Sequence, residues 1–224
     1  MPASPAEDLG PPRARRRTER GGLQKSCGVI DPIQEIARER ERARQHGDPL
    51  VDVCYLVTVA SAGRAEARAL TLRDVGERGV GVLINRTSPK WRQLSRTEAA
   101  TILIHWPSVR RQYRIWGAVA PMDPGRVDAY WRRKSHGSKL LEHYYTAFRP
   151  QSAELGSREE FLEGIDALRR RYPDSEAVPQ PPSLAGIYVA PHEIEVWHGS
   201  EERLHERRLF RRSGTEWEYT TLVP

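Results

Sequence analysis

The sequence predicts a mainly β protein with added helices (α+β), built around a closed or partly closed antiparallel barrel. Short apolar runs rich in β-branched residues recur along the chain, as in VDVCYLVTVA at 51–60. Helical segments are few and do not alternate with the strands, which excludes the βαβ order of a Rossmann sheet. The chain has 224 residues, 38% of them hydrophobic, enough for one domain with a sizeable core.

Helix signals precede four segments. At the first, Asp31 suits the N-cap, Pro32 suits the first helical position, and Gly47 suits termination. Ser or Asp followed by Pro opens the second and third segments. The fourth begins with a capping box formed by Ser157 and Glu160. The expected helices span residues 31–47, 88–96, 123–134 and 157–172.

The remaining apolar runs are expected to be strands, because they are short and are bounded by Gly, Pro or polar residues. A Gly-containing link at 75–78 separates two of them, 65–74 and 79–85, which favours an antiparallel pair. The expected strands span residues 51–60, 65–74, 79–85, 99–106, 110–120, 186–197, 206–213 and 216–222.

Charge is concentrated in the first 28 residues. The formal net charge is +6, and residues 1–28 carry six cationic against three acidic side chains, half of that charge. The remainder is nearly balanced, so nucleic-acid binding is not expected. The segment 1–28 is rich in Arg, Pro and Gly and lacks an apolar period, which predicts a disordered tail ahead of one domain at 29–224.

No apolar run is long enough to cross a bilayer, and the first residues lack the apolar centre of a secretory leader. A cytoplasmic protein without a membrane association is therefore expected. Only two cysteines occur, Cys27 and Cys54. Neither a disulfide framework nor a Cys-rich zinc site is expected, and no metal site is predicted.

The C-terminal segment contains the clearest candidate site. RLHER places Arg203, His205 and Arg207 at alternate positions, so an extended strand would project all three to one face. Two guanidiniums and an imidazole can bind a phosphate or an anionic ring, and Trp197 could add a flat apolar wall. The same spacing also suits a solvated basic strand face.

Together these residues resemble the C-terminal signature of the pyridoxamine 5'-phosphate oxidase family. The family pattern IE-x-W-x-G, RLH-[DE]-R, W and L-x-P corresponds to IEVWHG at 194–199, RLHER at 203–207, Trp217 and LVP at 222–224. This resemblance implies an antiparallel split β-barrel that binds FMN at the two-fold interface of a homodimer. The family includes flavin oxidases of phenazine biosynthesis.

Upstream motifs extend the resemblance over roughly residues 30–224. The family strand R-x-V-L-L-K appears as residues 68–73, and F-Y-T-N-x-x-S-x-K appears as 82–90, with Leu83, Ile84 and Pro89 in place of the usual Tyr, Thr and Arg. The resemblance implies the following FMN-binding residues: Arg68, Lys90, Gln112, Gln151, Ser152, Trp197 and Arg207. Gln151 and Ser152 can be matched only by allowing an insertion before them.

The resemblance also implies a clamp for a substrate phosphate, formed by Arg73, Tyr130, Lys134 and Ser138. Arg73 stands where the family has Lys, and Lys134 stands where it has Arg. A forked guanidinium and a point-like ammonium bind anions with different geometry. Tyr130 and Lys134 are four residues apart, so they would share a helix face. Segment 139–150 departs from the family pattern, which places the identity of the substrate in question.

The activity that the resemblance implies is oxidation of pyridoxamine or pyridoxine 5'-phosphate to pyridoxal 5'-phosphate, with dioxygen as acceptor and release of hydrogen peroxide. Arg203 and His205 would be catalytic and would bind the reacting end of the substrate. Two alternatives stay open: a related flavin oxidase with a phenazine-type substrate, and a non-catalytic protein that binds flavin or pyridoxal phosphate.

Overall fold

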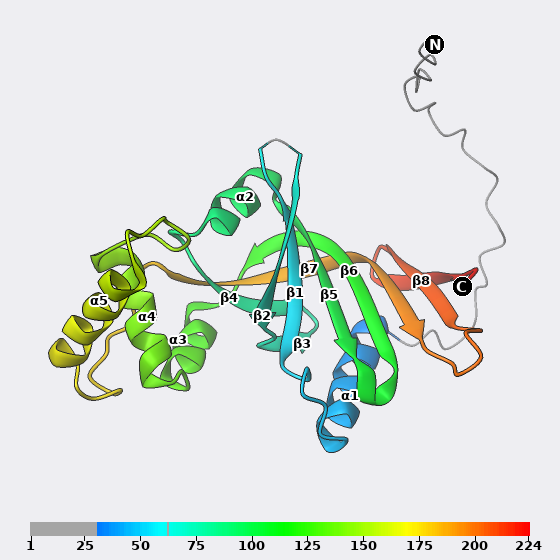
Figure 1. The fold of residues 1–224 in the computed structure, drawn as a ribbon. Helices are drawn as coiled ribbons and strands as arrows, with labels where there is room; N and C mark the ends of the chain where they lie inside the picture. Colours follow the sequence, from blue (N-terminus) through cyan, green and yellow to red (C-terminus); the bar gives the residue numbers. More distant parts are fainter. Residues whose placement is uncertain (1–30, 62) are drawn as a thin grey trace, which may run out of the picture.

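A curled antiparallel sheet forms the centre of the computed structural model, which describes residues 31–61 and 63–224 (Figure 1). In this part of the chain the strands run in the order β2-β1-β5-β6-β7-β4-β3, and β8 and β9 extend the sheet from β7. The strands are β1 (Val53–Val59), β2 (Ala65–Thr71), β3 (Asp74–Gly76), β4 (Gly79–Asn85), β5 (Ala99–Trp106), β6 (Arg111–Pro121), β7 (Leu184–His198), β8 (Glu206–Ser213) and β9 (Glu216–Leu222).

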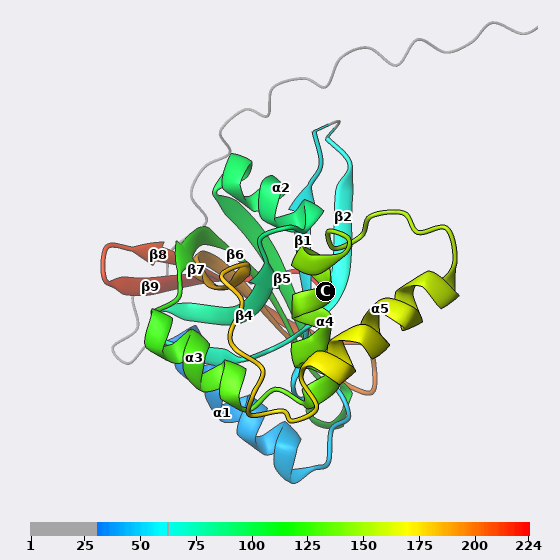
Figure 2. The same cartoon turned by 90° about the vertical axis from the view of Figure 1, so that its left-hand side faces the viewer.

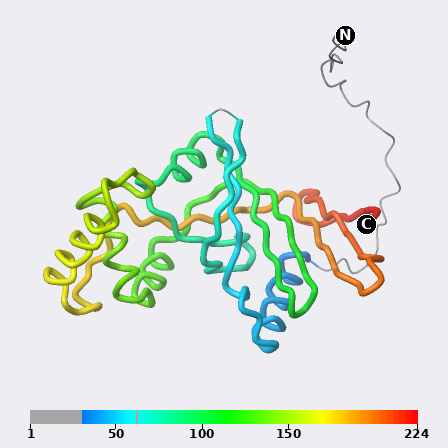
Figure 3. The backbone as a smooth tube through the Cα atoms, viewed as in Figure 1, coloured from blue at the N-terminus to red at the C-terminus, as the bar shows by residue number. Residues whose placement is uncertain are grey.

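Strand β7 is the central strand of the sheet and pairs with three other strands. It pairs with β6 along most of its length, with β4 at its first half and with β8 at its second half. Figures 1 and 3 show it crossing from the side of the helices α3 to α5 to the hairpin of β8 and β9. Residues at the two ends of β7 are therefore far apart in space within one copy of the chain.

Helices α3, α4 and α5 lie together on one side of the sheet, and α1 lies toward its other side (Figures 1 and 2). In the described residues they are α1 (Pro32–Gln45), α2 (Pro89–Thr97), α3 (Pro124–Arg132), α4 (His136–Ala147) and α5 (Arg158–Arg171). The expected caps are confirmed: the side chains of Asp31, Ser88, Asp123 and Ser157 accept hydrogen bonds from the first turns of α1, α2, α3 and α5. Helix α4 was not predicted from the sequence.

Two hydrophobic clusters hold the fold together. The first fills the barrel with side chains such as Leu56, Ile102 and Ile115, all fully buried. The second lies between the helices and the first half of β7, and includes Leu140 of α4 and Leu168 of α5. Because α4 is the shared element of the second cluster and of the site described below, packing of this cluster fixes the position of the site.

The fold class expected from the sequence, a mainly β antiparallel barrel with added helices, is confirmed. Two expectations on local structure are wrong. Strand β2 pairs with β1, whereas β4 forms its hairpin with the short β3. Lys134 follows the end of α3 at Arg132, so it does not share a helix face with Tyr130.

The expected alternation of Arg203, His205 and Arg207 along one strand is also wrong. Strand β8 begins only at Glu206, and Arg203 lies in the preceding loop with a left-handed φ of 62°. The expected tail at residues 1–28 lies outside the described residues. Within residues 31–61 and 63–224, no helix is long and apolar enough to cross a membrane.

Candidate functional site

A cavity of about 380 Å³ opens where β2, β4 and α4 meet. The apolar part of its lining includes Leu70 of β2 and Leu83 of β4. The polar part includes residues from six segments of the chain: Arg73, Asn85, Lys90, Lys134, Ser138, Glu142, Tyr145 and Gln151. Five of these were predicted from the sequence as cofactor or substrate ligands, so the fold brings together residues that are up to 78 positions apart.

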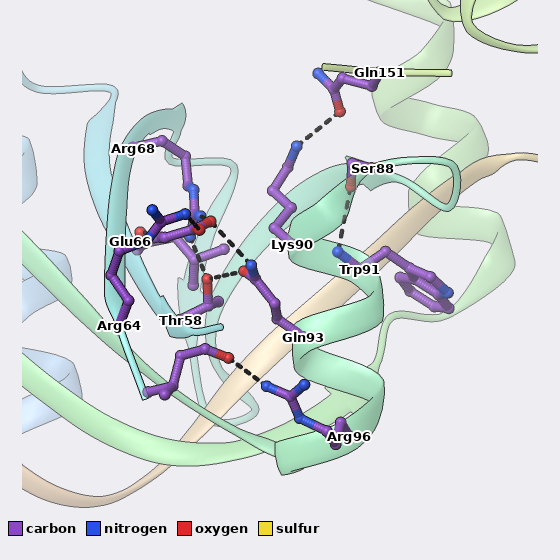
Figure 4. Close-up of polar contacts among 12 residues, drawn as sticks. Thr58, Arg64, Glu66, Arg68, Ser88, Lys90, Trp91, Gln93, Arg96 and Gln151 are labelled. Atoms are coloured by element: carbon purple, nitrogen blue, oxygen red, sulfur yellow. Dashed lines mark hydrogen bonds and ion pairs between the residues drawn. The ribbon is translucent and has the colours of Figure 1, made fainter. Parts of the chain in front are cut away.

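Lys90 enters the cavity from the first turn of α2, where Ser88 and Pro89 start the helix. Its side chain is only 8% exposed, and its Nζ donates to Gln151 Oε1 at 2.7 Å (Figure 4). Burial and, to a smaller extent, the positive charge of Arg68 lower the pKa of Lys90 to about 8, and the charge of Glu142 acts in the opposite direction. An anionic group bound here would therefore stabilise the ammonium.

Arg68 lies near Lys90 but is engaged within the chain. Its Nη1 donates to Thr58 Oγ1 at 2.5 Å, and its Nη2 pairs with Glu66 Oε2 at 3.2 Å. Gln93 of α2 bridges Thr58 and Glu66, so β1, β2 and α2 are joined by one polar network (Figure 4). Burial lowers the pKa of Arg68, and the charge of Glu66 opposes this effect. Arg68 thus contributes positive potential beside Lys90 and is not itself part of the cavity wall.

Three of the four residues predicted to bind a substrate phosphate lie together at the cavity. Arg73, Lys134 and Ser138 line the cavity, and Tyr130 supports Arg73 from behind. The Tyr130 hydroxyl donates to the Arg73 carbonyl oxygen at 3.1 Å, and its ring centroid lies 6.0 Å from the Arg73 guanidinium. Arg73 Nε is buried without a hydrogen-bond partner in the described part of the chain. Part of the donor capacity of Arg73 is therefore unused beside the cavity.

Glu142 is the one charged residue among the cavity residues, within the described part of the chain, that were not predicted as ligands. Its Oε1 lies 2.5 Å from Lys134 Nζ, and its Oε2 accepts from Asn85 Nδ2 at 2.8 Å. A helix opened by Ser135 would have placed Ser138, Glu142 and Tyr145 on one face, at spacings of four and three. That cap was the signal that could have revealed a carboxylate among the expected cations.

Gln151 and Ser152 follow α4. The Gln151 Oε1 accepts the hydrogen bond from Lys90 Nζ, and the Gln151 Nε2 donates to the Tyr145 hydroxyl at 3.3 Å. Ser152 is exposed and adopts a left-handed φ of 69°. The structure thus places Gln151 beside Lys90, despite the insertion needed to match it in the sequence, and leaves Ser152 at the rim.

The other predicted cofactor residues form a separate group on the second half of β7. Gln112 of β6 pairs in register with Trp197 of β7, which pairs in turn with Arg207 of β8. The ring centroids of Trp197 and His205 lie 4.7 Å apart. His205 Nδ1 accepts from the Ser200 backbone N–H at 3.1 Å, which leaves Nε2 to carry the proton of the neutral ring.

Glu195 holds this group in place from the adjacent part of β7. It is buried, pairs with Arg114 of β6, and accepts from Arg207 Nε at 3.0 Å. Arg207 Nη1 also donates to the Val223 carbonyl oxygen at 2.8 Å. One buried carboxylate therefore orients Arg207 and fixes the chain terminus against β8.

One chain does not bring the two groups together. Asn85, at the cavity, pairs with Leu184 at the start of β7, whereas Gln112 pairs with Trp197 near its end. About 40 Å of extended strand separates Leu184 from Trp197. No group of His, Cys, Asp and Glu side chains within the described ranges could hold a metal ion. The arrangement offers an anion-binding cavity at one end and an aromatic wall with basic side chains at the other.

Comparisons with known proteins find similar sequences and structures. Residues 185–224 match the family described as the pyridoxine 5'-phosphate oxidase C-terminal dimerisation region. A pyridoxine/pyridoxamine 5'-phosphate oxidase of Rubrobacter xylanophilus is 32% identical over 100% of both chains. One from Novosphingobium aromaticivorans is 36% identical over 82% of this chain and 87% of its own.

Among solved structures, PhzG from Burkholderia lata in complex with tetrahydrophenazine-1-carboxylic acid is similar, with a TM-score of 0.76 and 29% identity over 87% of this chain and 93% of that chain. A pyridoxamine 5'-phosphate oxidase-related, FMN-binding protein from Nostoc punctiforme has a TM-score of 0.65 and 21% identity, over 88% and 99% of the two chains. The second similarity concerns the fold alone.

Proposed function

The chain belongs to the pyridoxine/pyridoxamine 5'-phosphate oxidase family, and from this premise we propose that it is an FMN-dependent oxidase of an amine or alcohol carried by an anionic ring compound. The observation that carries the proposal is the cavity with Arg73, Lys90 and Lys134, in which three cations face one carboxylate. Such an excess of buried cations is favourable only beside an anion. Pyridoxamine and pyridoxine 5'-phosphate, the substrates in the relatives' names, are the first candidates.

The residues present fit FMN. Lys90 is buried, keeps a single hydrogen-bond acceptor, and lies beside a second cation that lowers its pKa, so a phosphate would relieve an existing electrostatic penalty. Gln151 would hold the same phosphate, with Arg68 adding positive potential and Ser152 at the rim. Trp197, Gln112 and Arg207 suit the ring system: an aromatic wall, an amide for its hydrogen-bonding edge and a cation.

The separation of the two groups supports a homodimer. No FMN molecule can bridge about 40 Å of strand between the cavity and Trp197. A second copy of the chain could place its own Trp197 and Arg207 beside the cavity of the first. The match of residues 185–224 to a dimerisation region supports the same arrangement. We therefore propose two sites per dimer, each composed of residues from both copies.

When bound, FMN would accept the hydride from the substrate and transfer the electrons to dioxygen, which is released as hydrogen peroxide. The side chains of the protein would bind and orient the substrate. Arg73, Lys134 and Ser138 line the cavity that would hold the anionic group of the substrate, and Tyr130 contacts Arg73 from outside it. Arg203 has no accessible neutral form and would orient the reacting end. His205 would exchange a proton with the substrate at Nε2, because its Nδ1 already accepts from Ser200.

A second candidate substrate has an observation in its favour. Glu142 neutralises Lys134, so the cavity is less suited to a phosphate dianion than the sequence suggested. A carboxylate-bearing ring, such as a phenazine precursor, needs less positive charge. The Burkholderia lata protein, crystallised with a carboxylic acid of this kind, is 29% identical to this chain.

The purified full chain provides the test. We expect a yellow protein that releases peroxide when pyridoxamine 5'-phosphate is added, and a colourless protein when Lys90→Met and Arg68→Ala are combined. Unphosphorylated pyridoxamine is the matched control substrate. Equal and feeble turnover of both amines would favour the phenazine-type substrate. A yellow protein that oxidises none of these compounds would instead be a non-catalytic flavin-binding protein, and a colourless wild-type protein would refute FMN binding.

A further inference from the structure

Glu142 changes the charge that the cavity offers to a ligand. Its carboxylate and the Lys134 ammonium are 13% and 9% exposed, and they form a 2.5 Å ion pair. The second carboxylate oxygen is held by Asn85 at 2.8 Å. Both oxygens are therefore engaged, and the carboxylate is fixed from two sides, by the turn after α3 and by the end of β4.

A ligand that recruited Lys134 would have to break this pair. Separating two buried opposite charges leaves the carboxylate without its compensating cation, which is strongly unfavourable. A phosphate dianion would also lie close to the negative charge of Glu142, and the resulting repulsion grows in proportion to the charge of the ligand. The pair thus weakens binding of a dianion more than binding of a monoanion.

Of the two cations expected to bind the substrate, Arg73 is the one that stays available. It forms no ion pair with a carboxylate of the described residues within 4.0 Å, and its buried Nε has no hydrogen-bond partner. A guanidinium can donate two parallel N–H bonds to the two oxygens of a carboxylate. Ser138 adds a hydroxyl donor at the same wall of the cavity.

We propose that Glu142 is a specificity-determining residue, which withholds Lys134 from the ligand so that the cavity prefers a ring compound with a singly charged carboxylate, held by Arg73, over one with a phosphate dianion. This inference rests on the proposed function only for the assignment of the cavity to the substrate. It deepens that function by naming the substrate class. Glu142 itself is a positioning residue, since it acts through Lys134.

Binding of two inert probes tests the proposal without turnover. The probes are pyridine-3-carboxylate and 4-deoxypyridoxine 5'-phosphate, titrated calorimetrically into the full chain as purified. Wild type should bind the carboxylate at least as tightly as the phosphate ester. Glu142→Gln should tighten phosphate binding about tenfold and carboxylate binding about threefold, because the Coulomb energy that is removed scales with ligand charge.

Two further variants keep the comparison decisive. Glu163→Gln removes the same charge from an exposed position on α5, outside the cavity, and should leave both affinities unchanged. The double variant Lys134→Met/Glu142→Gln has no uncompensated charge, so it should fold even if Glu142→Gln alone does not. Its affinity for the phosphate ester should equal that of wild type within about threefold, since Lys134 makes no contribution while Glu142 is present.

The opposite results would overturn the proposal. If Glu142 merely orients Lys134 toward the ligand, Glu142→Gln and the double variant will bind the phosphate ester more weakly than wild type does. Failure of wild type to bind either probe would also overturn it. Failure of the proposed oxidase is a separate result, because it is read from flavin absorbance and peroxide release, and neither enters these titrations.

Discussion

The pH dependence of FMN binding is the most direct test of Lys90. In the free protein its pKa is about 8, against an ordinary value of 10.5, because the ammonium is buried and lies near Arg68. The phosphate of FMN is already a dianion above pH 7, so its own charge stays constant there. Bound beside Lys90, the dianion would raise the pKa of this lysine. Above pH 8, binding must therefore take up a proton.

The size of the effect follows from this linkage. Below pH 8 Lys90 is protonated before and after binding, so affinity is constant. Between pH 8 and the higher pKa of the complex, the dissociation constant should rise about tenfold per pH unit, which amounts to about thirtyfold from pH 7 to pH 9.5. Lys90→Met should abolish this slope. It should also weaken binding at pH 7 by one to two orders of magnitude, roughly the contribution of a charge-assisted hydrogen bond.

Quenching of FMN fluorescence by the flavin-free full chain measures the constant at each pH. Arg92→Met is the matched control, because it removes a cation from the exposed face of the same helix, two positions from Lys90. It should keep the slope. The reasoning is refuted if wild-type affinity is flat between pH 7 and 9.5, or if Lys90→Met keeps the wild-type slope.

Three further outcomes are expected. In steady-state kinetics, Arg203→Ala should lower kcat/KM at least about tenfold for both pyridoxamine 5'-phosphate and pyridoxamine, because Arg203 would act at the reacting end of the substrate. An effect confined to the phosphorylated amine would contradict this role. Glu195→Gln should reduce the free energy of unfolding by about 2 kcal/mol in urea titrations, because it removes a buried charge that pairs with Arg207. Glu193→Gln, at a more exposed ion pair of the same strand, should change this free energy by less than about 0.5 kcal/mol. Equal effects of the two substitutions would contradict a stabilising role of the buried Glu195. Deletion of residues 1–28 should leave thermal stability and flavin content unchanged, and loss of either would show that this segment is needed.

Local sequence determined most of the elements. Helix starts at Asp31, Ser88 and Ser157 follow from side chains that accept hydrogen bonds from the next turn, an interaction that spans only two or three residues. The strands at 206–213 and 216–222 were predicted with the bounds that the structure shows. Helix α4 was not predicted, because its first turn contains His136, Gly137 and Ser138, which are poor helix formers.

Contacts between distant segments were decided by the tertiary structure. Strand β2 pairs with β1, although the link at 75–78 suggested pairing with β4. The turn residues of a hairpin indicate a turn but do not specify which flanking strands pair across it. Family motifs named Arg73, Lys90 and Lys134, but the charge of the cavity depends on Glu142, which no motif contains. Lys134 and Glu142 are buried together only because the second hydrophobic cluster packs α4 against β7 and the end of β4. Sequence patterns report interactions within a few residues, whereas pKa values and ligand charge depend on everything that packing brings within a few ångströms.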